Sequence, residues 1–508
     1  MTVRSAGWSE AWCCPERCSA PSRPSTRSAG SSGAATPRRA AASRGSIPCR
    51  SAPGRLRSGC EVYVSTLAEG VERIGEAVAA HAERWVVLGV ERDDTVVEVG
   101  SGVPDAVRSS HETALCLRVY RDGRVGTACT TRPGDVEELV GDAVRNAAHG
   151  PPAPTDIAPP GFAPPAMPAT VFDGDVRSVR LLAERLGALQ HAVGLMVHGT
   201  VTRTEQTVHR AAPEGRTETG DGFFHIAALA EGAVAQLPWT GWTRSATLPA
   251  ALTAWLRAAA EWDGLPSAEA PQRGHDVLLA PSAVHTLLTP LVTALSGTAV
   301  TAGRSFAAGR LGERLLHPSI SLCDHPSADG DGDAEGTGGL AWPVGDDDGV
   351  PCAGLTLVDR GVPVGIYHSR RTAAACGEAP TGHGFRGNAL RRTVLKPVTP
   401  VLNGATLSAG PADTGSFDEL LGGVREGVLI ESLMGGQQRA GSSPVVEARV
   451  RLGFLIRNGR VAGVLRPYPI ALDLREVLGT RFRAAGDRPW AVSRVWTGRL
   501  PFVLAGGA

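Results

Sequence analysis

Apolar and polar residues in the first third of the chain alternate in two rhythms. Helical spacing marks Ile74, Ala77 and Val78, and strand-like runs of Val, Leu and Ala follow them. Asp122-Gly123 separates two such runs, and its glycine permits the positive φ that a two-residue hairpin requires. The predicted elements are a helix over 71–82, strands over 85–90, 95–99, 114–120 and 124–130, and a helix over 136–148.

A similar order of elements follows in the next hundred residues. Trp255, Leu256 and Trp262 share the side of a helix that we expect to be buried. The predicted elements are a helix over 176–192, a pair of strands within 194–208, another pair within 222–234, and a helix over 248–262. The two segments, in which paired strands lie between helices, weakly echo one another.

The second half of the chain opens with a predicted strand over 274–279 and an amphipathic helix. Pro281-Ser282 begins this helix, and Gly297 ends it. Beyond the helix, short apolar runs on either side of polar turns predict hairpins. These hairpins pair 354–358 with 362–367 across Asp-Arg-Gly, and 448–456 with 461–465 across Asn458-Gly459.

Composition narrows the class of protein. The 508 residues are enough for two or three domains, since domains usually run to roughly 100–200 residues. The 51 basic residues equal the 51 acidic ones, so the whole-chain field steers the protein toward neither nucleic acid nor an anionic membrane. Lys396 is the only lysine, and the abundance of Arg, Ala, Gly and Pro indicates a GC-rich genome.

The N-terminal residues and the cysteines bear on location. Residues 1–60 are dominated by Ser, Arg, Ala, Pro and Gly and lack apolar periodicity, which predicts a disordered extension. The five cysteines beyond this extension are spread singly, which is typical of buried thiols in a reducing compartment. We find neither an apolar run of about 20 residues nor a secretory signal. A cytoplasmic protein is therefore expected.

One run, 321–386, concentrates the candidate chemistry. It strings together the segments Asp324-His325-Pro326, Asp347-Asp348-Gly349-Val350-Pro351, Leu357-Val358-Asp359-Arg360-Gly361-Val362-Pro363 and Thr381-Gly382-His383-Gly384-Phe385-Arg386. With 117–128, Gly435-Gly436 and 453–459, this order of motifs resembles the TldD/PmbA family, once called modulators of DNA gyrase. The resemblance runs from about Glu61 to the C-terminus. In that family a catalytic zinc-peptidase subunit pairs with a related partner.

Together with the patterning, the resemblance implies an α+β fold. We expect an N-terminal α+β domain with helix–strand repeats over 61–272, which includes an extended, proline-rich connector over 150–169. A mostly β C-terminal domain is expected over 273–508.

The helix predicted after Pro281 decides which subunit the chain resembles. In the catalytic subunits of the family, the matching helix carries His-Glu and a second His one turn later, and a cysteine near the end of the chain completes the zinc site. Here His285 is followed by Thr286 and, four positions on, Thr289, and no cysteine follows Cys376. This is the pattern of the metal-free, PmbA/TldE-like partner subunit, so no metal and no catalytic residue are predicted in this chain.

Other residues of the run are candidates for binding. Asp324, His325, His383 and Arg386 are predicted to face a substrate or a partner chain. Glycines around His383 allow close backbone approach, and the resemblance implies that this loop faces the cleft where a peptide threads. A replacement metal site is the alternative. Its donors would be His317, Cys323, Asp324, His325 and His383, but neighbours on an extended chain point to opposite sides, so few of them would converge.

The resemblance therefore implies the non-catalytic subunit of a heterodimeric TldD/PmbA-type zinc metallopeptidase that acts on unfolded or modified peptides. Its partner would be a TldD-like catalytic subunit that holds the zinc, with a peptide as substrate and with neither nucleic acid nor membrane as ligand. A GC-rich genome suggests maturation of a peptide natural product as the setting, but this link is an association and does not follow from the chemistry of the residues. Two alternatives stay open: a self-sufficient metallopeptidase with atypical ligands, and a non-enzymatic binding or regulatory protein.

Overall fold

The structure, a computed structural model, describes residues 66–82, 84–152, 172, 174–232, 236–271, 274–325, 345–387, 396–436 and 441–507. The extension predicted to be disordered over 1–60 and most of the connector predicted over 150–169 lie outside the described residues. The division into domains at residue 272 stays a prediction.

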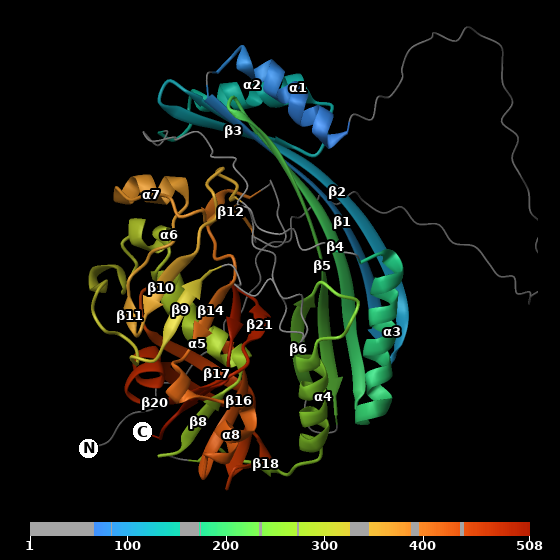
Figure 1. The fold of residues 1–508 in the computed structure, drawn as a ribbon, viewed down its shortest axis with the longest axis vertical. Coiled ribbons are helices and arrows are strands. Elements are labelled where there is room, and N and C mark those ends of the chain that lie inside the picture. The colour runs from blue at the N-terminus through green and yellow to red at the C-terminus, as the bar shows by residue number, and fades with distance from the viewer. Residues whose placement is uncertain are drawn as a thin grey trace, which may run out of the picture. The chain divides into compact units, whose positions relative to one another are not determined.

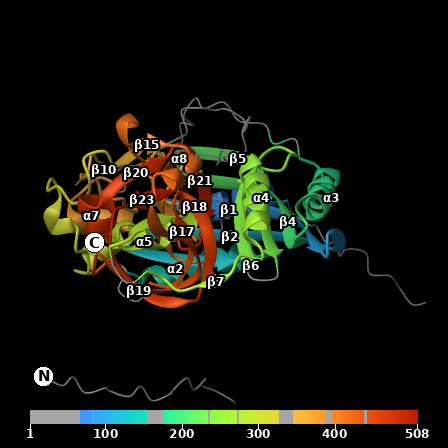
Figure 2. The ribbon, with the colours of Figure 1, turned by 90° about the horizontal axis from the view of Figure 1, so that it is seen from below.

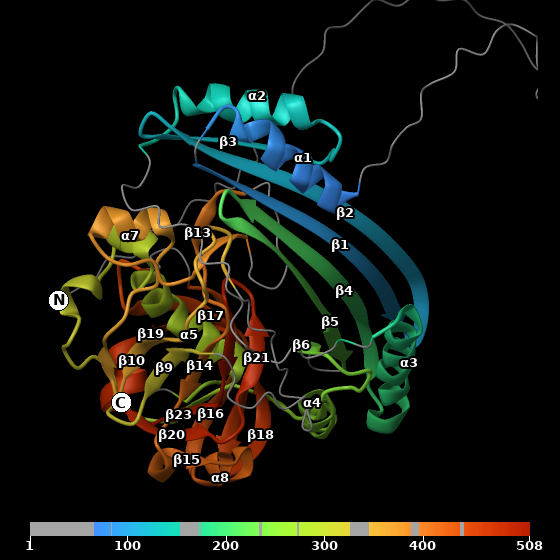
Figure 3. The same cartoon turned by 45° about the horizontal axis from the view of Figure 1, so that its top comes forward.

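A six-stranded antiparallel sheet forms the first part of the described chain, with the strand order β3-β2-β1-β4-β5-β6. Its strands are β1 (Arg84–Gly100), β2 (Val103–Arg121), β3 (Arg124–Thr130), β4 (Met196–Ala212), β5 (Gly215–Glu231) and β6 (Gln236–Thr243). The helices of this part are α1 (Leu67–Ala79), α2 (Val136–Ala147), α3 (Val176–Val193) and α4 (Ala250–Trp262). Figures 1 and 3 show α1 and α2 against one end of the long strands and α3 against the other. The two halves do echo one another, each as a helix, three strands and a helix.

Strand β1 corrects the predicted break between two short strands. The polar segment 91–94 continues the strand and pairs with β2 on one side and β4 on the other. Asp94 accepts a hydrogen bond from the Thr204 hydroxyl on β4 at 2.6 Å, and Arg92 forms an ion pair with Glu112 on β2. Because both neighbouring strands satisfy these polar groups, residues that read as a turn are stable inside a strand.

The strand pairs predicted within 194–208 and 222–234 are wrong for a related reason. Each segment belongs to one continuous strand, β4 or β5, and the two strands pair from Met196↔Glu231 to Ala212↔Gly215. Antiparallel sheets tolerate polar side chains on one face, so the alternating Thr, Glu and Arg residues do not interrupt these strands. Strand β6 was not predicted.

The helices of this part are confirmed within a few residues of their predicted ends. Helix α1 begins earlier than predicted because Thr66 forms a capping box with Glu69: the Thr66 hydroxyl accepts from Glu69 N, and the Glu69 carboxylate accepts from Thr66 N. Helix α3 ends at Gly194, which adopts the left-handed conformation (φ 71°) that such an end favours.

The rest of the described chain is mostly β, which confirms the predicted α+β fold class. A nine-stranded sheet contains β7 (Ser267–Ala268), β8 (Asp276–Leu279), β15 (Thr414–Gly415), β16 (Glu426–Gly435), β17 (Val445–Arg457), β18 (Arg460–Leu465), β19 (Tyr468–Asp473), β20 (Phe482–Gly486) and β23 (Val503–Ala505). A six-stranded sheet contains β9 (Ser321–Asp324), β10 (Leu355–Asp359), β11 (Val362–Pro363), β14 (Ala405–Ser408), β21 (Trp490–Ser493) and β22 (Thr497–Leu500). Strands β12 (Gly384–Arg386) and β13 (Val398–Pro400) form a separate pair, and the helices are α5 (Pro281–Ala294), α6 (Gly297–Thr301), α7 (Arg370–Cys376) and α8 (Phe417–Gly422).

Three two-residue turns confirm hairpins predicted from sequence, although the strand predicted over 362–367 is limited to β11, Val362–Pro363. Both central residues of each turn have positive φ, which is the type I′ pattern that matches the twist of the flanking strands. The turns and their φ angles are Asp122-Gly123 (51° and 70°), Arg360-Gly361 (45° and 81°) and Asn458-Gly459 (49° and 73°).

Helix α5 was predicted to be amphipathic, but it is buried on nearly all sides. Its apolar residues and strands of both C-terminal sheets form one core, and Figures 1 and 2 show the helix among these strands. A helix enclosed in this way must satisfy its polar side chains internally. The Thr286 hydroxyl accordingly donates to Ser282 O at 3.3 Å.

A second core contains residues from both sides of residue 272, including Trp255 of α4 and Phe454 of β17.

None of the helices in the described ranges combines the length and the apolar character needed to cross a bilayer.

Candidate functional site

His285 lies on α5 and is enclosed by the β21–β22 turn. Its side chain is 1% exposed, its Nε2 donates to Trp496 O at 3.0 Å, and its ring stacks on the Trp496 indole with centroids 4.6 Å apart. One helical turn later, the Thr289 hydroxyl donates to His285 O at 2.7 Å and accepts from Trp496 Nε1 at 3.1 Å. Burial lowers the pKa of His285 to about 4, so the imidazole is neutral at neutral pH.

These residues do not fit a zinc ion. Structural and catalytic zinc sites take three or four ligands from thiolate, imidazole and carboxylate groups. The described residues contain no group of three or more His, Cys, Asp or Glu side chains that could hold a metal ion. A zinc-binding helix of this kind would carry a second imidazole one turn after His285, but here Thr289 and the indole of Trp496 lie at that position.

Acidification is expected to destabilise the protein through His285. A histidine in an unfolded chain protonates near pH 6.5, whereas burial keeps His285 neutral until about pH 4. The unfolded state therefore binds the proton first, and the free energy of unfolding falls by roughly 3 kcal/mol between about pH 6.5 and pH 4. Urea denaturation of the wild type at several pH values between 7 and 4 measures this loss.

The His285→Gln variant isolates this contribution, because a glutamine amide can donate to Trp496 O without titrating. We expect its stability to fall less with acid than that of the wild type. His81→Gln changes an exposed histidine and should preserve the wild-type pH dependence. Identical acid sensitivity of the wild type and His285→Gln would contradict the assignment.

Asp324, one of the predicted site residues, forms the centre of a buried polar cluster. Its carboxylate accepts from Asn403 N at 2.7 Å and from Gly404 N at 2.8 Å, and it pairs with His383 Nε2 at 3.0 Å. The other ring nitrogen of His383 lies 2.8 Å from Thr381 O. Neither the Asp324 nor the His383 side chain is exposed, so the cluster ties three chain segments together inside the fold.

The remaining donors of the predicted replacement metal site do not join this cluster. His325 is exposed, and its Nε2 lies 3.2 Å from the Thr356 hydroxyl. Cys323 lies 3.9 Å from the same hydroxyl, and His317 packs against Phe482. Adjacent residues on β9 thus point apart, as the extended chain predicts.

Asp346 organises a second buried cluster on the segment 345–351. Its Oδ1 accepts from the backbone N–H groups of Asp348 at 2.9 Å and Val350 at 2.8 Å, and its Oδ2 accepts from Gly384 N at 2.8 Å. Burial and the charge of Asp348 raise the pKa of Asp346, while the N–H groups of Val350 and Gly384 oppose this shift. Three backbone donors therefore share the two oxygens of Asp346, which makes this side chain the common acceptor of the segment.

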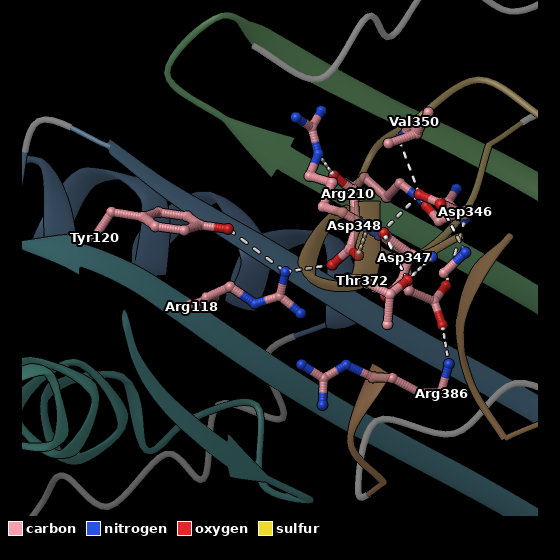
Figure 4. A network of polar contacts seen from close by, with 12 residues as sticks. Arg118, Tyr120, Arg210, Asp346, Asp347, Asp348, Val350, Thr372 and Arg386 are labelled. Atoms are coloured by element: carbon pink, nitrogen blue, oxygen red, sulfur yellow. Dashed lines mark hydrogen bonds and ion pairs between the residues drawn. The ribbon is translucent and has the colours of Figure 1, made fainter. Parts of the chain in front are cut away.

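Arginines of the first sheet reach this segment, as Figure 4 shows. Arg118 on β2 forms an ion pair with Asp348, and Arg210 on β4 lies 3.8 Å from the Asp347 carboxylate. Arg210 also donates to Asp346 O at 3.2 Å and to Gly345 O at 3.0 Å. The first sheet, β1 to β6, therefore holds the acidic segment 345–351 through buried charged side chains.

Arg386, another predicted site residue, belongs to the same network. Its backbone N–H donates to Asp347 at 2.8 Å, and its guanidinium donates to Lys396 O at 2.8 Å. Sequence reasoning did not single out Arg118 and Arg210. The sequence does place the charged Arg118 between Leu117 and Val119, two apolar residues that are buried in the structure. This position is the feature that could have indicated Arg118.

Comparisons with known proteins bear on this arrangement. Two family models match the chain, the PmbA/TldA metallopeptidase domain 1 over residues 85–147 and the PmbA/TldA metallopeptidase C-terminal domain over residues 272–500. Together they span more than half of the sequence.

Similar proteins are named metalloproteases. One from Methanothermobacter thermautotrophicus is 27% identical over 176 residues, which are 35% of this chain and 35% of that protein. One from Archaeoglobus fulgidus is 29% identical over 181 residues, 35% of this chain and 37% of that protein. The match thus spans about a third of the length of these curated relatives.

Solved structures show the same fold over most of the chain. TldE from Thermococcus kodakarensis has a TM-score of 0.73 and 16% sequence identity, with 86% of this chain and 99% of that chain covered. A protein described as a modulator of a DNA gyrase, from Thermotoga maritima, has a TM-score of 0.69 and 21% identity, with 87% and 99% covered. At these identities the likeness establishes the fold alone.

Proposed function

The chain belongs to the PmbA/TldD metallopeptidase family, and on this premise we propose that it is the non-catalytic, PmbA/TldE-like subunit of a two-chain zinc metallopeptidase. A TldD-like partner would supply the zinc and the general base. The pair would act on unfolded or modified peptides, with maturation of a peptide natural product as one setting.

The observation that carries the proposal is the environment of His285. A catalytic helix needs two imidazoles one turn apart with open space for a metal and its water. Here the single imidazole donates to Trp496 O, stacks on the Trp496 indole and has Thr289 beside it. Rebuilding a zinc site at this position would require the removal of a buried tryptophan as well as the addition of ligands.

The predicted site residues have different roles in this proposal. His325 is exposed and available to a substrate or a partner chain. Asp324 and His383 are buried, and Arg386 is 5% exposed, so these three would act by fixing the loops that carry such contacts.

The decisive experiment measures metal and activity with and without a catalytic family member. The full chain, purified alone, is expected to hold substoichiometric zinc and to leave a labelled unfolded polypeptide intact. Mixed with a family member that has the two-histidine helix, it should form a stable complex and the polypeptide should be cleaved. His285→Gln in this chain should leave cleavage by the complex unchanged, whereas replacing either histidine of the partner's helix should abolish it.

Two outcomes would overturn the proposal. Stoichiometric zinc and hydrolysis by the chain alone would identify a self-sufficient metallopeptidase. If the mixture showed no complex formation and no hydrolysis, the chain would be identified as a binding or regulatory protein.

A further inference from the structure

A cavity of about 370 Å³ lies among α4, β6, the start of α8 and the segment 486–491. Its volume is within the range of about 300–1,000 Å³ that is typical of small-molecule sites. Two phenylalanines and half of the ten tryptophans of the chain line it. These tryptophans are Trp239, Trp242, Trp255, Trp262 and Trp490.

Small residues of α4 leave the space open. Ala250, Ala254 and Ala258 line the cavity and recur every four positions, so they lie along one face of the helix. Larger side chains at these positions would fill the cavity. The aromatic residues thus stand around a volume that no protein side chain in the described ranges occupies.

A buried carboxyl group lies among these aromatic rings. Glu431 on β16 lines the cavity and is 7% exposed. Burial raises the pKa of Glu431 to about 7, and Trp255 and Arg494 oppose this shift. The buried indole Nε1 of Trp255 approaches this carboxyl but reaches hydrogen-bond geometry with no described residue.

We propose that this cavity binds a primary ammonium group attached to an apolar body, with the ammonium on Glu431 and the body between the tryptophans. A buried carboxylate is costly unless a cation pairs with it. Indole faces attract cations and also cover apolar groups, so the walls and the carboxyl favour the same ligand. The Glu431 carboxylate would repel an anion. The exposed Asp487 and Arg488 at the mouth of the cavity carry opposite charges, so together they favour neither sign of ligand charge.

This ligand chemistry has two sources, a free aralkylamine or the N-terminus of a peptide that begins with an apolar residue. The inference concerns a site other than the His285 region and does not depend on the proposed pairing with a catalytic subunit.

Titrations of the full chain with matched probes test the site. At pH 8, where Glu431 is mostly ionised, 2-phenylethylamine should bind and change the tryptophan fluorescence. The isosteric 2-phenylethanol and the anion 3-phenylpropionate should bind about tenfold more weakly or not at all, as expected for loss of a charged contact. Phenylalanyl-glycinamide and its N-acetyl form distinguish the sources: selective binding of the former identifies peptide N-termini, and its failure leaves free amines as the ligand.

Variants locate the binding. Glu431→Gln should weaken 2-phenylethylamine binding about tenfold or more, and Ala258→Leu should prevent it by filling the cavity. Glu426→Gln, on the same strand but exposed and outside the cavity, should leave binding unchanged. Circular dichroism verifies that each variant folds, and Ala258→Leu tests the site even if Glu431→Gln does not fold. Absence of amine binding, equal binding of the alcohol, or insensitivity to both cavity variants would overturn the proposal.

Discussion

Replacing Asp346 with alanine is expected to lower the free energy of unfolding by about 3 kcal/mol or more, since each buried donor left without an acceptor costs about 1–3 kcal/mol. Three such donors depend on this carboxylate, the backbone N–H groups of Asp348, Val350 and Gly384. The Asp346 side chain has no exposed surface, so bulk solvent does not supply an alternative acceptor to these donors in the folded protein. Urea denaturation measures the loss, and hydrogen exchange should show faster exchange of these three amides.

Two matched variants sharpen the test. Asp346→Asn keeps one oxygen that can accept from Asp348 and Val350 but turns an NH2 group toward Gly384 N, so its loss should lie between the wild type and the alanine variant. Asp359→Ala removes an exposed aspartate from the end of β10 and should change stability by less than about 0.5 kcal/mol. An alanine variant of Asp346 as stable as Asp359→Ala would show that the carboxylate does not hold the segment.

The helices and turns could be predicted from the sequence because their determinants are local. Apolar periodicity placed α2, α3 and α4 within a few residues of their ends. The same holds for turns in which Gly123 and Gly459 supply positive φ. In each case the residues that specify the conformation are close to one another in the sequence.

The long strands could not be predicted in full because their continuity depends on neighbours far away in the sequence. The polar segment 91–94 reads as a turn until Thr204 on β4 and Glu112 on β2 are known to pair with it. Helix α5 shows the same limit: it looks amphipathic until two sheets are placed around it. The sequence pattern shows which secondary structure a residue prefers. It does not show which distant segment will pack against that residue.

The candidate sites divide in the same way. The sequence shows that His285 has no second imidazole one turn on, but not that Trp496, 211 positions away, occupies the space. It also shows that 321–386 concentrates acidic residues. It does not show that Arg118 and Arg210 of the first sheet contact Asp348 and Asp346. These arginines lie 230 and 136 positions away from the residues that they contact. These carboxylates organise the loops that carry them.

Removing either member of the buried pair Asp324 and His383 is expected to cost about 3 kcal/mol, because the remaining group loses a hydrogen-bond partner in a buried site. Asp324→Ala should be the more damaging change, since Asn403 N and Gly404 N lose their acceptor as well. Urea denaturation of the two single variants and the double variant forms a double-mutant cycle. Its coupling energy should reach about 1–3 kcal/mol, because once one partner is absent the loss of the other matters less.

The exposed neighbour His325 provides the control for this cycle. His325→Ala should change stability by less than about 0.5 kcal/mol and should add independently to Asp324→Ala. If Asp324→Ala and His383→Ala were also additive, their contact would contribute nothing to the stability of the fold. Strong coupling, in contrast, would assign His383 to the internal framework and leave His325 as the residue of this segment that can reach a substrate or a partner.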